Sequence, residues 1–140
     1  MSSITATCEG NLVADPELRE TNTGLAVCNF RLAVTNRVRA GNNDFVDQTE
    51  WINVVAWRNT AVNVAASLKK GDRVTVSGSL KIREWTHREG HKMLTPEIHA
   101  SSVGAALTFH VMRPEKARDA LAQPAENMAQ DDPIYDEASA

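Results

Sequence analysis

Alternation of apolar and polar residues is the feature that most constrains this chain, and it recurs along most of the first 105 residues. Every second side chain of a β-strand lies on the same face, so this alternation indicates half-buried strands. It predicts strands over residues 4–12, 25–36, 45–58, 73–85 and 92–100. Turn-forming residues separate these segments, including Asp15-Pro16 and Asn22-Thr23-Gly24.

One segment, residues 60–70, has a helical pattern instead. Its apolar residues recur at helical spacing, namely Ala61, Val64, Ala65 and Leu68. Asn59 or Thr60 can cap its start, and Gly71 can end it. Five strands with one intervening helix favour an all-β fold, a small closed barrel, over repeated strand–helix–strand units.

Charge is distributed unevenly along the chain. Residues 1–118 contain all 15 Lys and Arg residues against 12 acidic residues, a net charge of +3. Residues 119–140 contain six acidic residues and no basic ones, a net charge of −6. From about Pro114 onward large apolar residues are scarce, so we expect a disordered acidic tail (113–140) after a folded domain (1–112).

The sequence also indicates the cellular compartment in which the protein is expected. No apolar run approaches the ~18 residues of a membrane helix, and the first ten residues lack the features of a secretory signal. Cys8 and Cys28 are too few for a disulfide scaffold, and both fall on inward strand faces, so we expect free, buried thiols. These features predict a cytoplasmic protein.

The three tryptophans fall on the polar faces of their predicted strands. Trp51 and Trp57 share a face with Asn53 and Val55, and the opposite face carries the apolar residues Ile52, Val54 and Ala56. Trp85 shares its face with the cations Lys81 and Arg83. Exposed indoles beside cations suit single-stranded nucleic acid, because every base has a face that can stack and phosphates attract the cations. The alternative is that the tryptophans form a second core or a subunit interface.

Several segments, taken in order, resemble the bacterial single-stranded DNA-binding proteins. They are Gly10-Asn11-Leu12 with the run from Asp15 to Arg19, CNFRLAVTN, QTEWINVVAWRNTAVNVAASLKKGDRVTVSGSLKIREW, and Pro96-Glu97-Ile98. Together they cover about residues 4–105, and the loop after the second strand is similar to that of actinobacterial members. The resemblance implies an OB-fold, a five-stranded Greek-key barrel, in a non-enzymatic homotetramer without cofactor or metal. It also implies protection of single-stranded DNA during replication, recombination and repair at the nucleoid.

Carried over residue by residue, the resemblance places Trp51, Trp57 and Trp85 at base-stacking positions. Many family members have a further tryptophan near Val38, and this chain has Arg37-Val38-Arg39 there. The cations expected to contact phosphates are Arg31, Arg37, Arg39, Arg58, Arg73, Lys81, Arg83, Arg88 and Lys92. In the tail, Asp131, Asp132, Pro133, Ile134 and Tyr135 are similar to the family's partner-binding tip for replication and repair proteins, although five more residues follow it here.

Other functions have weaker support in the sequence. An OB-fold subunit that uses its tryptophans to bind another protein would also fit the acidic tail and the calculated pI of about 5.8. His87 and His91 have a metal-like spacing but no nearby cysteine pair, and Asp44, Asp47 and Glu50 suit a solvated strand end. Phosphate-binding loops, nucleophile elbows and zinc-protease motifs are missing from the sequence.

Overall fold

The computed structural model describes residues 2–117, which contain six strands and one helix. In chain order these are β1 (Ile4–Leu12), β2 (Glu17–Glu20), β3 (Ala26–Arg39), β4 (Phe45–Trp57), α1 (Arg58–Ser67), β5 (Arg73–Thr86) and β6 (Lys92–Ala105). The chain divides into two units, residues 1–110 and 111–140, and all seven elements belong to the first. Residues 111–117 contain no helix or strand.

The strands form one sheet in the order β1-β5-β6-β4-β3-β2, and β1 also pairs with β3. This additional pairing closes β1, β5, β6, β4 and β3 into a barrel, with β2 attached outside it along β3. The β4–β6 pairing is parallel and all others are antiparallel. The predicted five-stranded OB-fold barrel with a single helix is confirmed.

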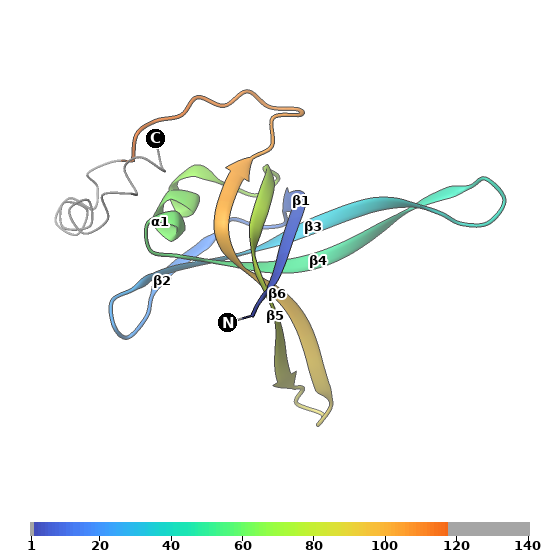
Figure 1. The fold of residues 1–140 in the computed structure, drawn as a ribbon, viewed down its shortest axis with the longest axis horizontal. Helices are drawn as coiled ribbons and strands as arrows, with labels where there is room; N and C mark the ends of the chain where they lie inside the picture. The colour runs from blue at the N-terminus through green and yellow to red at the C-terminus, as the bar shows by residue number, and fades with distance from the viewer. Residues whose placement is uncertain (1, 118–140) are drawn as a thin grey trace. The chain divides into compact units, whose positions relative to one another are not determined.

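Two hairpins extend well beyond the barrel (Figure 1). The β3–β4 hairpin stays paired out to Arg39 and Phe45, and the β5–β6 hairpin stays paired out to Thr86 and Lys92. Along β4 and β5, buried positions are confined to the half that lies in the barrel, and the outer half is exposed. Each hairpin therefore combines a barrel wall with a projecting arm.

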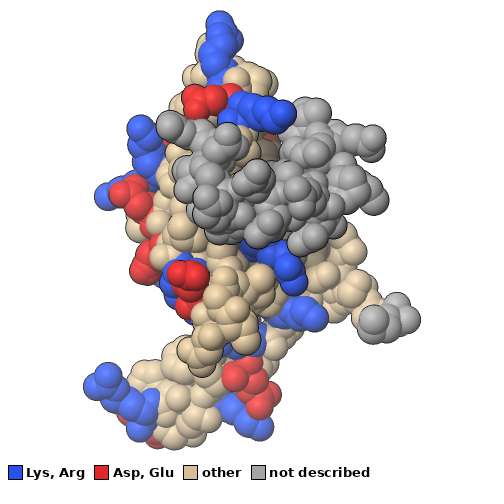
Figure 2. Space-filling model, turned by 90° about the vertical axis from the view of Figure 1, so that its left-hand side faces the viewer, with Lys and Arg blue, Asp and Glu red and all other residues tan. Residues whose placement is uncertain are grey.

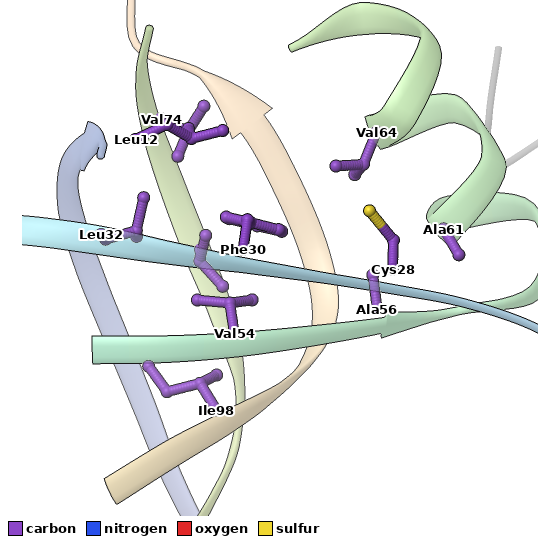
Figure 3. Close-up of a cluster of buried hydrophobic side chains, with 11 residues drawn as sticks. Leu12, Cys28, Phe30, Leu32, Val54, Ala56, Ala61, Val64, Val74 and Ile98 are labelled. Carbon is purple, nitrogen blue, oxygen red and sulfur yellow. The ribbon is translucent and has the colours of Figure 1, made fainter. Parts of the chain in front are cut away.

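The core lies inside the barrel and beneath α1. Side chains from β1, β3, β4, β5 and β6 meet there, as the close-up in Figure 3 shows. Val64 and Ala61 of α1 lie near Cys28 and Ala56, so the helix covers one part of the core (Figure 3). These two helical residues are 5% and 0% exposed, which confirms the apolar stripe predicted for this helix.

The structure corrects several details of the predicted elements. β3 continues to Arg39, three residues beyond its predicted end, so Arg37 and Arg39 lie in the strand rather than in the loop after it. β2 was not predicted, because its four residues are all exposed and show no apolar alternation. α1 begins at Arg58 rather than Thr60, and its N-cap is Trp57, without a side-chain cap. β6 continues to Ala105, five residues beyond the predicted strand end.

The helix also ends earlier than predicted, at Ser67. The backbone N–H groups that follow bond to carboxylates: Lys69 N–H donates to Asp72 Oδ2 (3.0 Å) and Lys70 N–H to Asp15 Oδ1 (2.8 Å). Gly71 lies beyond them with a φ of 94°, a conformation that favours glycine. The prediction that Gly71 ends the helix is therefore wrong, because the helix ends four residues before it and two aspartates support the chain between the helix and Gly71.

No helix among the described residues is long and apolar enough to span a membrane. Cys8 and Cys28 are free thiols, and burial raises the pKa of both. Cys28 is buried as predicted, whereas Cys8 is only partly buried. The predictions for the tail from residue 118 onward, including the tip around Asp131 and Tyr135, lie outside the described residues.

Candidate nucleic-acid interface

The outer face of the β3-β4-β6-β5 sheet carries all three tryptophans. Strand register sets a row of residues across these four strands: Arg31 is opposite Asn53, Asn53 is opposite Glu97, and Glu97 is opposite Lys81. Side chains two residues apart share a face. Trp51 and Trp57 therefore flank this row along β4, and Trp85 lies four residues beyond Lys81 on β5.

Each indole is substantially exposed, although tryptophan is usually well buried in monomeric proteins. The exposed fractions are 49% for Trp51, 36% for Trp57 and 39% for Trp85. None of the three belongs to the core cluster. Such exposed aromatic area on one face of a sheet is available for a ligand or a partner.

Trp51 is held by a cation from the neighbouring strand. The guanidinium carbon of Arg31 lies 5.2 Å from the centroid of the indole, a distance at which a cation and an aromatic ring attract each other. Ala33 is the residue directly opposite Trp51 on β3, and its small side chain leaves space beside the ring. Arg31 therefore orients Trp51 and keeps a positive charge next to it.

Trp57 stacks on His99, a residue of β6. The ring centroids of Trp57 and His99 are 6.4 Å apart, with 25° between the ring planes. The Nε2 atom of His99 is 2.8 Å from Glu97 Oε1, and this carboxylate is mostly buried. Glu97 thus fixes the imidazole, which in turn supports one face of the Trp57 indole.

Trp85 is oriented by a hydrogen bond across the β5–β6 hairpin. Its indole N–H donates to Thr95 Oγ1 at 2.9 Å. Met93 is the residue directly opposite it on β6. The ring of His87, two residues further along the chain, has its centroid 6.1 Å from that of the Trp85 indole.

The candidate cations differ in how strongly they are already paired. Arg73 is the most engaged, because its Nε is 2.6 Å from Glu9 Oε2 and its Nη1 donates to Asn11 Oδ1 at 2.9 Å. It also lies at the start of β5, twelve residues and about 40 Å along the strand from Trp85. Of the predicted cations, Arg73 is therefore the least suited to contact the same ligand as Trp85.

The other paired cations lie on the two projecting arms. Arg37 is 3.6 Å from Asp47, Arg39 donates to Asn43 Oδ1 at 2.6 Å, and Lys92 is 3.5 Å from Glu84. Exposed ion pairs contribute only about 0–1 kcal/mol, so a phosphate can replace the carboxylate of Asp47 or Glu84 at little cost. Figure 2 shows Lys and Arg gathered with acidic residues at the lower end of the view, where the β5–β6 hairpin ends.

Four predicted cations have no ion pair, side-chain hydrogen bond or cation–π contact within residues 2–117. They are Arg58, Lys81, Arg83 and Arg88. Lys81 and Arg83 share the outer face of β5 with Trp85, and Arg88 lies in the turn after it. The structure thus groups unpaired positive charge around Trp85.

Sequence reasoning missed the residues of β6 that support Trp57 and Trp85. Thr95, Glu97 and His99 alternate along β6 and so share its outer face, which the sequence could have indicated. Their proximity to Trp85 and Trp57 depends on pairing between strands distant in sequence, which alternation cannot reveal.

Asn29 is a further residue on the outer face that sequence reasoning missed. It lies opposite Val55 on β4 and Glu17 on β2. Its Oδ1 atom is buried and has no hydrogen-bond partner among the described residues.

The site offers no cluster for metal chemistry within the described part of the chain. No group of three or more His, Cys, Asp or Glu side chains there could hold a metal ion. Desolvation raises the pKa of the Cys8 and Cys28 thiols, which keeps them protonated and poorly nucleophilic at neutral pH. The arrangement is suited to binding, with aromatic faces and cations on one surface.

Comparison with known proteins agrees with this geometry. Residues 4–106 match the model of the "Single-strand binding protein family". A single-stranded DNA-binding protein of Corynebacterium glutamicum is 49% identical over 105 residues, which cover 74% of this chain and 47% of that protein. The chain therefore aligns with about half the length of that relative. One from Mycobacterium leprae is 40% identical over 115 residues, covering 81% of this chain and 68% of the relative.

A solved structure has the same architecture. The small single-stranded DNA-binding protein from Streptomyces coelicolor aligns with a TM-score of 0.67 and 35% identity, covering 79% of this chain and 100% of that one. These relatives are actinobacterial, as the sequence resemblance predicted. The family consists of DNA-binding proteins rather than enzymes. Its model spans nearly the whole barrel and both hairpins, and this chain therefore belongs to the single-strand binding protein family.

Proposed function

We propose that this protein binds single-stranded DNA without sequence preference, by stacking bases on Trp51, Trp57 and Trp85. The observation that carries the proposal is the set of three exposed indoles on one outer sheet face, each oriented by a neighbouring side chain. The names of the relatives, single-stranded DNA-binding proteins, support the same ligand.

Stacking explains why such a site would tolerate any sequence. Every nucleobase has a π-face, and a base stacked on an aromatic side chain contributes ~1–3 kcal/mol. Orientation by Arg31, His99 and Thr95 reduces the rotamer entropy that the indoles lose when a base binds. The site is therefore partly preorganised in the free protein.

The spacing of the rings suits successive bases along one strand. Trp51 and Trp57 are six residues apart on β4, about 20 Å at ~3.3 Å per residue. That separation is too large for both rings to sandwich one base. Arg31 and Lys81 lie in the row between them, where they can contact the phosphates of the intervening nucleotides. Glu97 in the same row is already engaged by His99.

The wider role follows from the family resemblance. We propose that residues 1–112 are the DNA-binding domain and that the protein acts as a homotetramer in the cytoplasm at the nucleoid. It would protect single strands during replication, recombination and repair. The segment Asp131–Tyr135 would recruit replication and repair proteins.

A titration with oligo(dT) tests the proposed function. Base stacking quenches indole fluorescence, so the intrinsic emission should fall in a saturable way as the oligonucleotide is added. A subunit that uses its tryptophans to bind another protein would give no response to DNA. Saturable quenching supports the proposal, and constant emission together with no binding in a gel-shift assay would refute it.

A further inference from the structure

Arg58 adopts a backbone conformation that arginine rarely takes. Its φ is 57°, in the left-handed region, where the Cβ atom of any residue other than glycine is crowded by a carbonyl oxygen. Within residues 2–117, Asn43 is the only other non-glycine residue with a positive φ. Asparagine tolerates this region, and the Asn43 side chain also accepts a hydrogen bond from Arg39. Arg58 is therefore the residue whose strain has no local compensation.

This residue lies where β4 passes directly into α1, without a loop between them (Figure 1). Along the end of β4, Val54 and Ala56 face the core and are fully buried. Continued alternation would turn residue 58 toward the same side. Arg58 is exposed instead. The left-handed residue thus breaks the alternation and keeps the arginine side chain in solvent, directly after Trp57.

The helix gives no reason for an arginine at this position. The N-terminus of α1 has no side-chain cap and no acidic residue in its first turn. The positive end of a helix dipole disfavours a cation, so the charge of Arg58 adds a second unfavourable contribution to that of its φ. Glycine would avoid both, because it has no charge and adopts a left-handed φ without strain.

Contacts of the side chain do not explain the arginine either. Within residues 2–117, Arg58 forms no ion pair, side-chain hydrogen bond or cation–π contact. A second exposed arginine without an ion pair there, Arg19, lies in the same row of the sheet, because Arg19 is opposite Val27 and Val27 is opposite Trp57. Trp57 therefore has one uncompensated cation next to it in the chain and another in its row, and both can attract an anion.

We infer that Arg58 keeps its strained conformation because its guanidinium binds the phosphate of the nucleotide whose base stacks on Trp57. This inference rests on the proposed function. His99 stacks on one face of the indole, so the base lies on the other face, and the cation is on the adjacent residue. At this position the chain gives up folding stability for DNA affinity, and a glycine would make the protein more stable but a weaker binder.

Arg58→Gly is the first variant that tests the inference. Its melting temperature should rise by about 2–6 °C, because relief of the left-handed strain exceeds the entropy that glycine adds to the unfolded chain. Its affinity for oligo(dT) should fall about fivefold at low salt, the upper end of what one exposed ion pair contributes. Its slope of log K against log salt should become shallower by about 0.7, the value for one phosphate contact.

Two further variants separate strain from charge. Arg58→Ala removes the charge but keeps a Cβ atom, so it should lose the same affinity and slope as Arg58→Gly and melt well below it. Arg58→Lys keeps both the charge and the strain, so it should retain the salt slope and the melting temperature of the unmodified protein.

Ser67→Gly is the matched control for the glycine substitution. Ser67 is the last residue of α1, is exposed, and does not have a positive φ. Glycine there should lower the melting temperature, because it loses more conformational freedom on folding, and it should leave DNA binding unchanged. A rise in stability confined to position 58 would thus report the strain at that residue.

The outcomes distinguish this inference from the proposed function. Unchanged affinity and salt slope in Arg58→Gly would overturn the inference, and so would a melting temperature no higher than that of Arg58→Ala. An unmodified protein that fails to bind oligo(dT) would overturn the proposed function itself. Circular dichroism and light scattering check that each variant keeps the fold and the assembly of the unmodified protein.

Discussion

Replacing Trp85 by alanine should weaken oligo(dT) binding about five- to 150-fold without unfolding the protein. The range follows from the ~1–3 kcal/mol that a base stacked on an aromatic side chain contributes. The fold should tolerate the change because Trp85 is 39% exposed and lies outside the core cluster. The substitution removes the hydrogen bond to Thr95, which contributes about 1 kcal/mol at most in so exposed a position, and the contact with the His87 ring on the same exposed arm.

Thr95→Val tests how much of that contribution depends on orientation. The indole remains, but its N–H loses its acceptor at 2.9 Å. Binding should weaken by about two- to tenfold, the equivalent of one hydrogen bond of ~0.5–1.5 kcal/mol. A loss as large as that of Trp85→Ala would mean that an unoriented indole contributes almost nothing.

Ile82→Ala is the matched control for both variants. Ile82 lies on the same strand, is 54% exposed, and has the opposite parity to Trp85, so it lies on the other face. Fluorescence anisotropy of a labelled oligo(dT) gives the affinity, and circular dichroism and light scattering report folding and assembly. The reasoning fails if Trp85→Ala weakens binding no more than Ile82→Ala, or if it unfolds or dissociates the protein.

The remaining predictions concern salt, packing, the tail and the thiols. Log K for oligo(dT) should fall with log salt at about −0.7 per phosphate neutralised, and a flat plot would exclude phosphate contacts. Gly78→Ala should destabilise the fold by ~1–3 kcal/mol or more in urea denaturation, because its Cβ would overlap the His99 carbonyl oxygen. Gly104→Ala, with open space around the new methyl group, should be tolerated. Deleting residues 119–140, with their six acidic residues, should raise DNA affinity at low salt, and unchanged affinity there would argue against competition by the tail. Burial raises the pKa of the Cys28 thiol, so the folded state disfavours the thiolate, and stability should fall as the pH rises above the unfolded thiol's value. Cys28 should therefore react with a thiol reagent only on unfolding, and rapid labelling of the native protein would contradict its burial.

Local patterns in the sequence were sufficient to predict most of the strands. Alternation identified the five barrel strands and assigned Trp51, Trp57 and Trp85 to outer faces. This works because successive side chains of a strand point to opposite faces, so the order of residues alone indicates which share a face. The apolar spacing of Ala61 and Val64 likewise identified the face of α1 that lies against the core.

Elements without a local signal could not be predicted in the same way. β2 is exposed at all four positions, and only its pairing with β3 makes it a strand. The helix start at Arg58 has no side-chain cap to mark it. Its end is set by Asp15 and Asp72, and Asp15 is far away in the sequence.

The sequence by itself therefore determined which residues face inward, which face outward, and where positive charge is concentrated. Only the tertiary structure decided which side chains support each tryptophan. The parallel β4–β6 pairing brings His99 to Trp57, and the β1–β5 register places Glu9 against Arg73, which removes that arginine from the free cations. Both depend on register between strands far apart in the chain, and register is fixed by the packing of the whole barrel rather than by any local run of residues.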